Sequence, residues 1–133
     1  MDHPTERDLS HVPLFADLSE EFRSHVAEHF EVEEHPVGHA IVREGDSGYA
    51  FYVIATGQAV VTQDGQELRR LGPGDFFGEI SIIGDGRRTA TVTAATPVVV
   101  WQMFGTSFRV LQSARPEVAG ALEAAMAQRL AGN

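Results

Sequence analysis

Three features that could bind an anion and a hydroxyl group lie close together in the stretch GEISIIGDGRRTATVTA, residues 78–94. The guanidinium of Arg88 matches a phosphate group with two parallel hydrogen bonds. We expect GEIS, which ends at Ser81, to form the first turn of a short helix whose free backbone N–H groups attract an anion. Glu79 adds a carboxylate that can accept a hydrogen bond from a sugar hydroxyl. A phosphate group and a hydroxyl bound side by side would suit a nucleotide.

The position of Arg88 in its predicted strand indicates which way its side chain points. Beyond it, small apolar residues alternate with threonines, which is the two-residue period of a half-buried strand. Arg88 shares the parity of Val92 and Ala94, so we expect it to point inward with them. Because arginine stays charged, it needs an anion there. From the residues alone two partners remain open, namely the phosphate of a ligand and a carboxylate of the chain such as Glu79.

Composition limits the possible functions. The chain has 133 residues, of which 43% are apolar, and this favours one compact domain. The net charge of −9 and the lack of a basic stripe argue against nucleic acid as a partner. No run approaches the roughly 20 apolar residues of a membrane-spanning helix. The polar start MDHPTERDLS does not resemble a signal peptide, so we expect a cytoplasmic protein without a membrane partner.

The six histidines could in principle bind a metal ion, because jelly rolls also host metal-dependent cupin enzymes. Such sites need two histidines one residue apart, then a glutamate and a distant third histidine. Here His35 and His39 are four residues apart and no histidine follows them. Cysteine is absent, and no nucleophile–base pair is evident. We therefore expect no metal, no cofactor and no enzymatic activity, with a cupin-type enzyme kept as an unfavoured alternative.

The first stretch, to about Phe30, is expected to be helical. Phe22, Val26 and Phe30 recur every four residues, and Ser19 or Asp17 can serve as the N-cap. The apolar segment VPLFADLS before them is expected to pack on the rest of the protein.

The middle stretch is expected to be rich in short strands. Glycine- or proline-containing turns separate runs such as AFYVIA, AVVTQ and VVVWQM, which indicates an antiparallel sandwich or barrel, plausibly a jelly roll. Asp64-Gly65 predicts a type I′ hairpin turn. The wholly apolar VVVW is assigned to the most enclosed strand. Thr91 and Thr93 are expected to be ordinary strand-surface residues.

The last stretch returns to helix. Thr106 or Ser107 is expected to cap a short helix through Leu111, and Pro116 to be the first residue of a second helix. The second helix carries an apolar stripe, which we expect to pack on the protein itself: Val118, Ala121, Leu122, Ala125, Met126 and Leu130.

Short motifs in a fixed order cover nearly the whole chain. They are VPLFADLSEE, Gly38, Ile41, EGD (44–46), YVI (52–54), Gly57, LGPGDFFGEI (71–80) and RRTATV (87–92). In this order they resemble the cyclic nucleotide-binding domain shared by catabolite activator proteins, regulatory subunits of cyclic-nucleotide-dependent kinases and ligand-gated channels. The resemblance implies a mainly β fold with flanking helices (α+β), namely an antiparallel β-roll or jelly roll with an N-terminal helix and two C-terminal helices.

The resemblance also implies how the chain is divided. Residues 1–133 would form a single binding domain with no catalytic residues. Its parts would be an N-terminal helical segment (1–30), a β-roll (31–104) that includes a phosphate-binding cassette (78–89), and C-terminal hinge and lid helices (105–133). Leu122 and Met126 are candidates to cover the base, although their stripe fits a core better.

The resemblance implies roles for the residues of the cassette. Arg88 would pair with the cyclic phosphate, and Glu79 would accept the ribose 2′-OH. Gly78, Ile80 and Ser81 would contribute backbone groups. Thr89 would add a phosphate contact.

Two positions depart from the family pattern. Arg87 stands where proline is frequent, and Ser81 stands where alanine is usual. With Thr89 compatible with both ligands, we expect a sensor of cAMP, or else of cGMP, in which the cassette and C-terminal helices move on binding. The downstream partner or output domain is unknown. The alternative is a relative that does not respond to cyclic nucleotides and acts as an interaction module.

Overall fold

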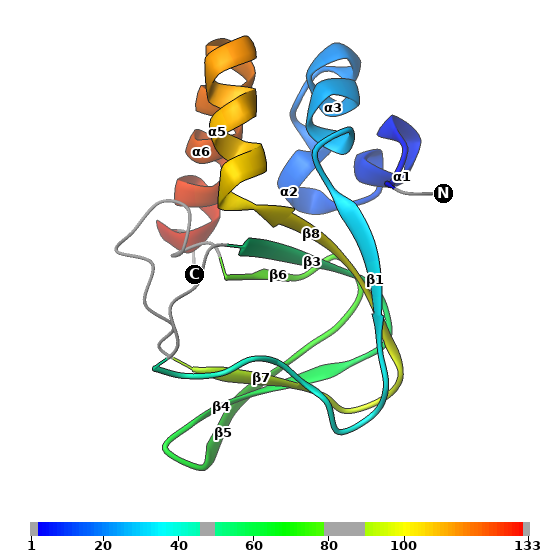
Figure 1. Ribbon diagram of the computed structural model, residues 1–133, viewed down its shortest axis with the longest axis vertical. Helices are drawn as coiled ribbons and strands as arrows, with labels where there is room; N and C mark the ends of the chain where they lie inside the picture. The colour runs from blue at the N-terminus through cyan, green and yellow to red at the C-terminus, as the bar shows by residue number, and fades with distance from the viewer. Residues whose placement is uncertain (1–2, 46–49, 79–89, 132–133) are drawn as a thin grey trace.

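The computed structural model describes residues 3–45, 50–78 and 90–131. Its strands form two four-stranded sheets that face each other below a layer of helices (Figure 1). All strand pairs are antiparallel, so the predicted mainly β roll with flanking helices is confirmed. The first sheet has the order β1 (Glu31–His35), β8 (Val98–Phe104), β3 (Ala50–Thr56) and β6 (Phe76–Phe77). The second has the order β2 (Ala40–Val42), β7 (Thr91–Ala94), β4 (Ala59–Gln63) and β5 (Gln66–Leu71).

Strand β8 is enclosed, as its apolar sequence predicts. It lies between β1 and β3 in the first sheet, and five of its seven residues are buried. Successive side chains point to opposite faces. Val98 and Val100 therefore belong to the core between the sheets, whereas Trp101 and Met103 belong to the core under the helices.

The hairpin between β4 and β5 has the predicted turn. Asp64 and Gly65 have φ values of 53° and 80°, and a type I′ turn requires a positive φ at both central positions. Further along, Arg69 faces Val61 and Glu67 faces Thr62. Leu68 is therefore an extra, bulged residue in β5. Bulges and charges of this kind discourage further pairing at a sheet edge.

Three helices precede the strands: α1 (Glu6–Ser10), α2 (Pro13–Ala16) and α3 (Glu20–Ala27). Ser19 caps α3, because its Oγ accepts a hydrogen bond of 3.1 Å from the N–H of Phe22. The first of the two predicted caps is thus confirmed, and Asp17 is instead the C-cap of α2. Val26 and Phe30 are buried, as the four-residue spacing predicts.

Two helices follow β8: α5 (Gly105–Ala114) and α6 (Pro116–Ala131). The predicted cap of the first is wrong, because Thr106 and Ser107 lie inside the first turn and Phe104 is an N-cap without a side-chain hydrogen bond. The cause is that β8 runs directly into α5, so no connecting residue is left to cap the helix. The helix also extends beyond Leu111. Pro116 does begin α6, as predicted.

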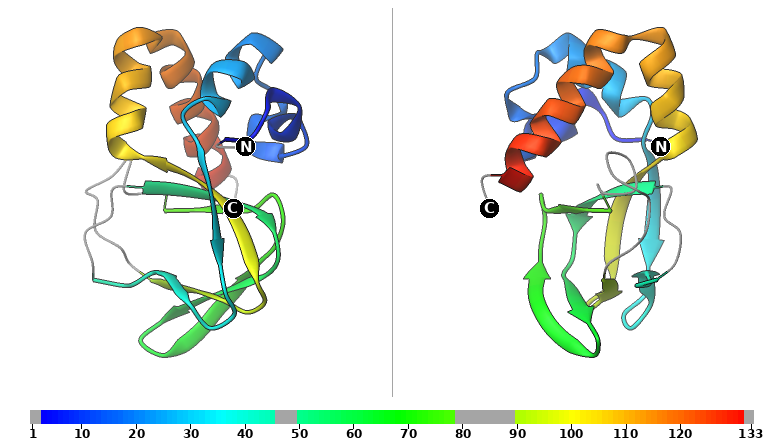
Figure 2. Two further views of the ribbon diagram at one scale, coloured as in Figure 1. Left: turned by 45° about the vertical axis from the view of Figure 1, so that its right-hand side comes forward. Right: turned by 90° about the vertical axis from the view of Figure 1, so that its left-hand side faces the viewer.

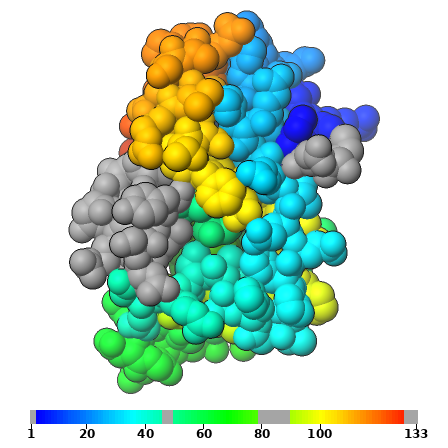
Figure 3. Space-filling model, viewed as in Figure 1, coloured from blue at the N-terminus to red at the C-terminus, as the bar shows by residue number. Residues whose placement is uncertain are grey.

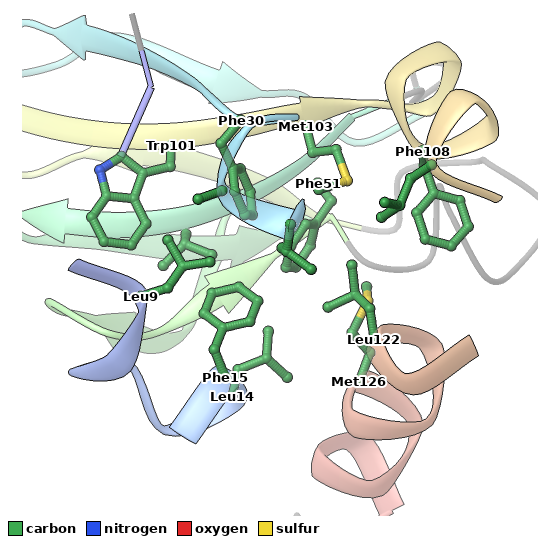
Figure 4. Packing of buried hydrophobic residues seen from close by; sticks show 14 of the residues in the cluster. Leu9, Leu14, Phe15, Phe30, Phe51, Trp101, Met103, Phe108, Leu122 and Met126 are labelled. Atoms are coloured by element: carbon green, nitrogen blue, oxygen red, sulfur yellow. The ribbon is translucent and has the colours of Figure 1, made fainter. Parts of the chain in front are cut away.

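The helices cover one face of the first sheet, as the two views of Figure 2 show. On the face in Figure 3, the surface of α3 adjoins that of α5 above the strands. Figure 4 shows the core that they share with the sheet, in which Leu122 and Met126 of α6 are fully buried. The stripe of α6 is therefore core, as expected, while the side chain of Leu130 lies outside the described part.

Candidate functional site

The space between the two sheets is lined by apolar side chains from both of them. Val92 and Ala94 of β7 are 3% and 2% exposed and face this space, with Ala90 packed against them. The inward parity predicted for this strand is therefore confirmed over its described residues. The complete lining cluster is Val42, Ala50, Tyr52, Ile54, Ala59, Val61, Leu71, Phe77, Val92, Ala94, Val98 and Val100.

The segment 79–89 connects the two sheets, because β6 belongs to the first sheet and β7 to the second. Gly78 precedes this segment with a φ of 81°, a value that glycine adopts without the steric cost of a Cβ. Of the predicted site residues, the structure describes Gly78. The others lie outside the described residues, and their roles stay predictions: Glu79, Ile80, Ser81, Arg88 and Thr89.

A stacked aromatic pair holds the start of the connecting segment. Phe77 faces Tyr52 across the β3–β6 pair, and their rings stack with centroids 4.9 Å apart and planes 10° apart. Both residues are buried in the cluster between the sheets. Such cross-strand ring contacts stabilise a strand pair. They fix the end of the strand that Gly78 directly follows.

A pair of hydrogen bonds holds the other end of the segment. The N–H of Glu44 donates to Oγ1 of Thr91 at 3.0 Å, and the Glu44 carboxylate accepts from the N–H of Asp64 at 3.2 Å. Glu44 thus joins the end of β2, the start of β7 and the β4–β5 turn. Thr91 lies on the half-buried outer face of β7, as predicted, and it also makes this contact. Sequence reasoning missed this contact because it joins residues 47 positions apart.

No arginine whose side chain is described lies in the interior between the sheets. The chain has no lysine, and the arginines with described side chains are exposed, apart from Arg23, which pairs with Glu6 at 2.7 Å in the helical layer. Within the segment that connects the sheets, the sequence places Arg87 and Arg88. An anion bound between the sheets could therefore pair with an arginine of this segment.

Polar side chains lie along the β1–β8 edge of the same interior. Glu33 is opposite Val100 in the register, so it shares the inward face. Its Oε2 accepts a hydrogen bond of 2.8 Å from Nε2 of the buried Gln102. Its Oε1 lies 2.7 Å from Nε2 of His35 without hydrogen-bond geometry. The rings of His35 and His39 stack at 4.9 Å. The sequence EVEEH contains no signal for these inward groups, because its one apolar residue, Val32, has the opposite parity.

Within residues 3–45, 50–78 and 90–131, no three histidine, cysteine or acidic side chains are arranged to hold a metal ion. No helix in these ranges is both long enough and apolar enough to cross a membrane.

Comparison with known families agrees with this architecture. The cyclic nucleotide-binding domain family matches residues 32–115, which is more than half of the chain and includes the segment that connects the sheets. The chain therefore belongs to the cyclic nucleotide-binding domain family.

Individual relatives show the same relationship. The cGMP-dependent protein kinase egl-4 of Caenorhabditis briggsae is 42% identical over 97 residues, which is 68% of this chain and 13% of the kinase. The cAMP-dependent protein kinase regulatory subunit of Neurospora crassa is 33% identical over 105 residues, 77% of this chain and 27% of the subunit. This chain thus spans only a small part of either relative's length.

A solved structure confirms the fold. The N-terminal domain of a transcriptional regulator from Streptomyces coelicolor A3(2) superposes with a TM-score of 0.80 at 34% identity, covering 94% of this chain and 93% of that domain.

Proposed function

We propose that this protein is a regulatory sensor that binds a 3′,5′-cyclic nucleotide between its two sheets, with cAMP favoured over cGMP. The family match across the connecting segment is the observation that carries this proposal. The relatives include one protein named for cGMP and one named for cAMP, so the preference for cAMP is the finer part of the proposal. The protein would regulate a partner without catalysing a reaction itself.

The ligand would be held by two different kinds of surface. The apolar cluster between the sheets would take up part of the nucleotide, and the connecting segment would supply its polar contacts. Arg88 would neutralise the cyclic phosphate, and Glu79 would accept the ribose 2′-OH. The remaining proposed contacts come from Gly78, Ile80, Ser81 and Thr89.

The described parts suggest how binding could be transmitted. Phe77 and Thr91 anchor the two ends of the connecting segment on opposite sheets, so a ligand that draws the segment inward would act on both. β8 runs directly into α5, so a change at the sheet would reach the C-terminal helices. The shift requires tighter binding to the closed state than to the open state. Residues 1–133 would act as one cytoplasmic domain that signals to a protein partner or to an output domain.

The first experiment compares two adjacent arginines by isothermal titration with cAMP and cGMP. Removing a charge that pairs with a buried anion costs about 2–5 kcal/mol, so Arg88→Ala should weaken binding by roughly 30-fold to several thousand-fold. Arg87→Ala removes the same charge one position away and should have little effect. Equal losses in the two variants would refute the role of Arg88. No binding by the unmodified protein would refute the sensor and favour an interaction module.

A second experiment tests the ribose contact. Glu79→Gln should weaken cAMP binding less than Arg88→Ala does. If Glu79 accepts the 2′-OH, then 2′-deoxy-cAMP should bind the Glu79→Gln variant almost as well as cAMP does. An undiminished penalty for the deoxy compound in this variant would contradict the assignment.

A further inference from the structure

A second cavity of about 470 Å³ lies between the N-terminal helices and the first sheet. Its volume is within the range of ligand and side-chain pockets. The helical side contributes the end of α1 and the start of α2, and the sheet side contributes the end of β3, the β5–β6 turn and β8. The residues of its lining used below are Asp8, Pro13, Ala55, Pro73, Gly74 and Trp101.

Trp101 presents an unused hydrogen-bond donor at this cavity. It is the one tryptophan of the chain and is 9% exposed. Its indole N–H bonds no acceptor among the described residues. The N–H still reaches solvent, because the buried side-chain atom without a partner in that part of the chain is Nε2 of His35. Solvent can satisfy this donor, and the acceptor of a ligand could replace the solvent there. A bound molecule with a carbonyl oxygen would supply such an acceptor.

Asp8 gives the rim of the cavity its charge. The residue is exposed, and its Oδ2 accepts a hydrogen bond of 2.8 Å from the N–H of Thr5 in a capping box. Its Oδ1 makes no hydrogen bond to any described residue, so it can accept from a ligand. No arginine lines the cavity, and the whole chain carries a net charge of −9. These charges favour a cation and attract a basic partner.

The walls between these two polar groups are apolar. Pro13 begins α2, and Gly74 of the β5–β6 turn lies close to it, since a Cβ on Gly74 would be 3.5 Å from Cδ of Pro13. Pro73 and Ala55 complete this surface. A ligand that fits must therefore combine a cationic end, an apolar stem and a carbonyl oxygen.

We propose that this cavity binds an arginine-bearing segment of a partner protein. The guanidinium would pair with Asp8, the side-chain methylenes would pack on the two prolines, and a backbone carbonyl would accept from the indole of Trp101. Arginine suits this position better than lysine because its guanidinium is more weakly hydrated and presents several donors to a carboxylate. The site shares Ile54 with the lining of the space between the sheets, but the proposal does not depend on the proposed nucleotide function.

The lone tryptophan makes a direct experiment possible. Its indole N–H gives one cross-peak in a ¹⁵N–¹H correlation spectrum, and this peak reports on the cavity. The probe is the capped peptide acetyl-Ala-Arg-Ala-amide, titrated without nucleotide. We expect a saturable shift of the peak, and a weaker one with the matched citrulline peptide, which lacks the charge. Absence of a saturable shift, or equal affinity for the two peptides, would overturn the proposal.

Two variants test the charge at the rim. Asp8→Asn keeps an oxygen that can cap α1 but loses the charge, and it should weaken the arginine peptide about two- to fivefold, as expected for an exposed ion pair. Glu67→Gln removes another exposed charge, on β5 and outside the cavity lining, and should change nothing. Equal affinities in the two variants would contradict a role for Asp8. Ethylguanidinium provides a last comparison, because binding as tight as that of the peptide would identify a small-cation site and overturn the peptide proposal.

Discussion

Replacing Thr91 with valine tests how the connecting segment is anchored. The change removes one hydroxyl and keeps the β-branched shape. In the structure this hydroxyl accepts the N–H of Glu44 at 3.0 Å, and both residues are half-buried. A hydrogen bond of this kind contributes about 0.5–1.5 kcal/mol. Because water can reach a half-buried donor, we expect Thr91→Val to lower the free energy of unfolding by roughly 1 kcal/mol.

Thr93 provides the matched control for this prediction. It lies on the same strand and face, is also half-buried, and its side chain has no hydrogen bond within the described residues. Because valine has a good strand propensity, Thr93→Val should be neutral or slightly stabilising. Urea denaturation followed by circular dichroism measures both variants, and Thr91→Ser should recover most of the loss. The same free energy of unfolding for Thr91→Val and Thr93→Val would refute the anchoring role.

The anchoring role also limits the effect on ligand binding. If Thr91 only positions the segment, its loss should weaken cAMP binding by at most about fivefold, which corresponds to the roughly 1 kcal/mol lost in stability. A loss as large as that expected for Arg88→Ala would mean that Thr91 contacts the ligand itself, contrary to this account.

Three other predictions concern the fold and its ligand. Gly57→Ala should lower the free energy of unfolding by more than the about 1–3 kcal/mol that a left-handed conformation costs, because the added Cβ would lie 2.3 Å from the carbonyl oxygen of Pro97. Gly38→Ala has the positive φ without this clash, so urea denaturation should show a smaller loss of stability. Burial lowers the pKa of His29 below 6.5 in the folded protein. The unfolded chain therefore binds more protons as the pH drops below 6.5, and the free energy of unfolding should fall. An equally steep loss of stability in acid for His29→Gln and the unmodified protein would contradict this. Saturating cAMP, at 100 times its dissociation constant, should raise the melting temperature by roughly 10 °C, and no shift in a thermal-denaturation scan would count against binding.

Local signals in the sequence predicted local structure well. The cap at Ser19, the turn at Asp64-Gly65 and the start of α6 at Pro116 each depend on residues within one turn of the chain. The alternation in β7 likewise predicted which side chains face the interior, because the period of a strand is a local property. These features could be derived without knowing where distant residues lie.

Features that depend on distant residues could not be derived in this way. The contact between Glu44 and Thr91 and the contact between Glu33 and Gln102 cross 47 and 69 positions of the chain. The sequences of the segments involved contain no pattern that predicts these two contacts. The cap predicted at Thr106 was wrong for a related reason, since the sequence does not show that β8 continues into α5 without a break. In the candidate site, Gly78 is described, and the assignments of Glu79 and Arg88 still depend on the family resemblance.

The structure of the protein crystallised with cAMP is the most direct test of the central claim. The account predicts the nucleotide between the two sheets, with its cyclic phosphate within hydrogen-bond distance of the Arg88 guanidinium and its 2′-OH on Glu79. An ordered cAMP molecule elsewhere, or an Arg88 side chain that faces solvent or pairs with an acid of its own chain while cAMP is bound, would contradict it.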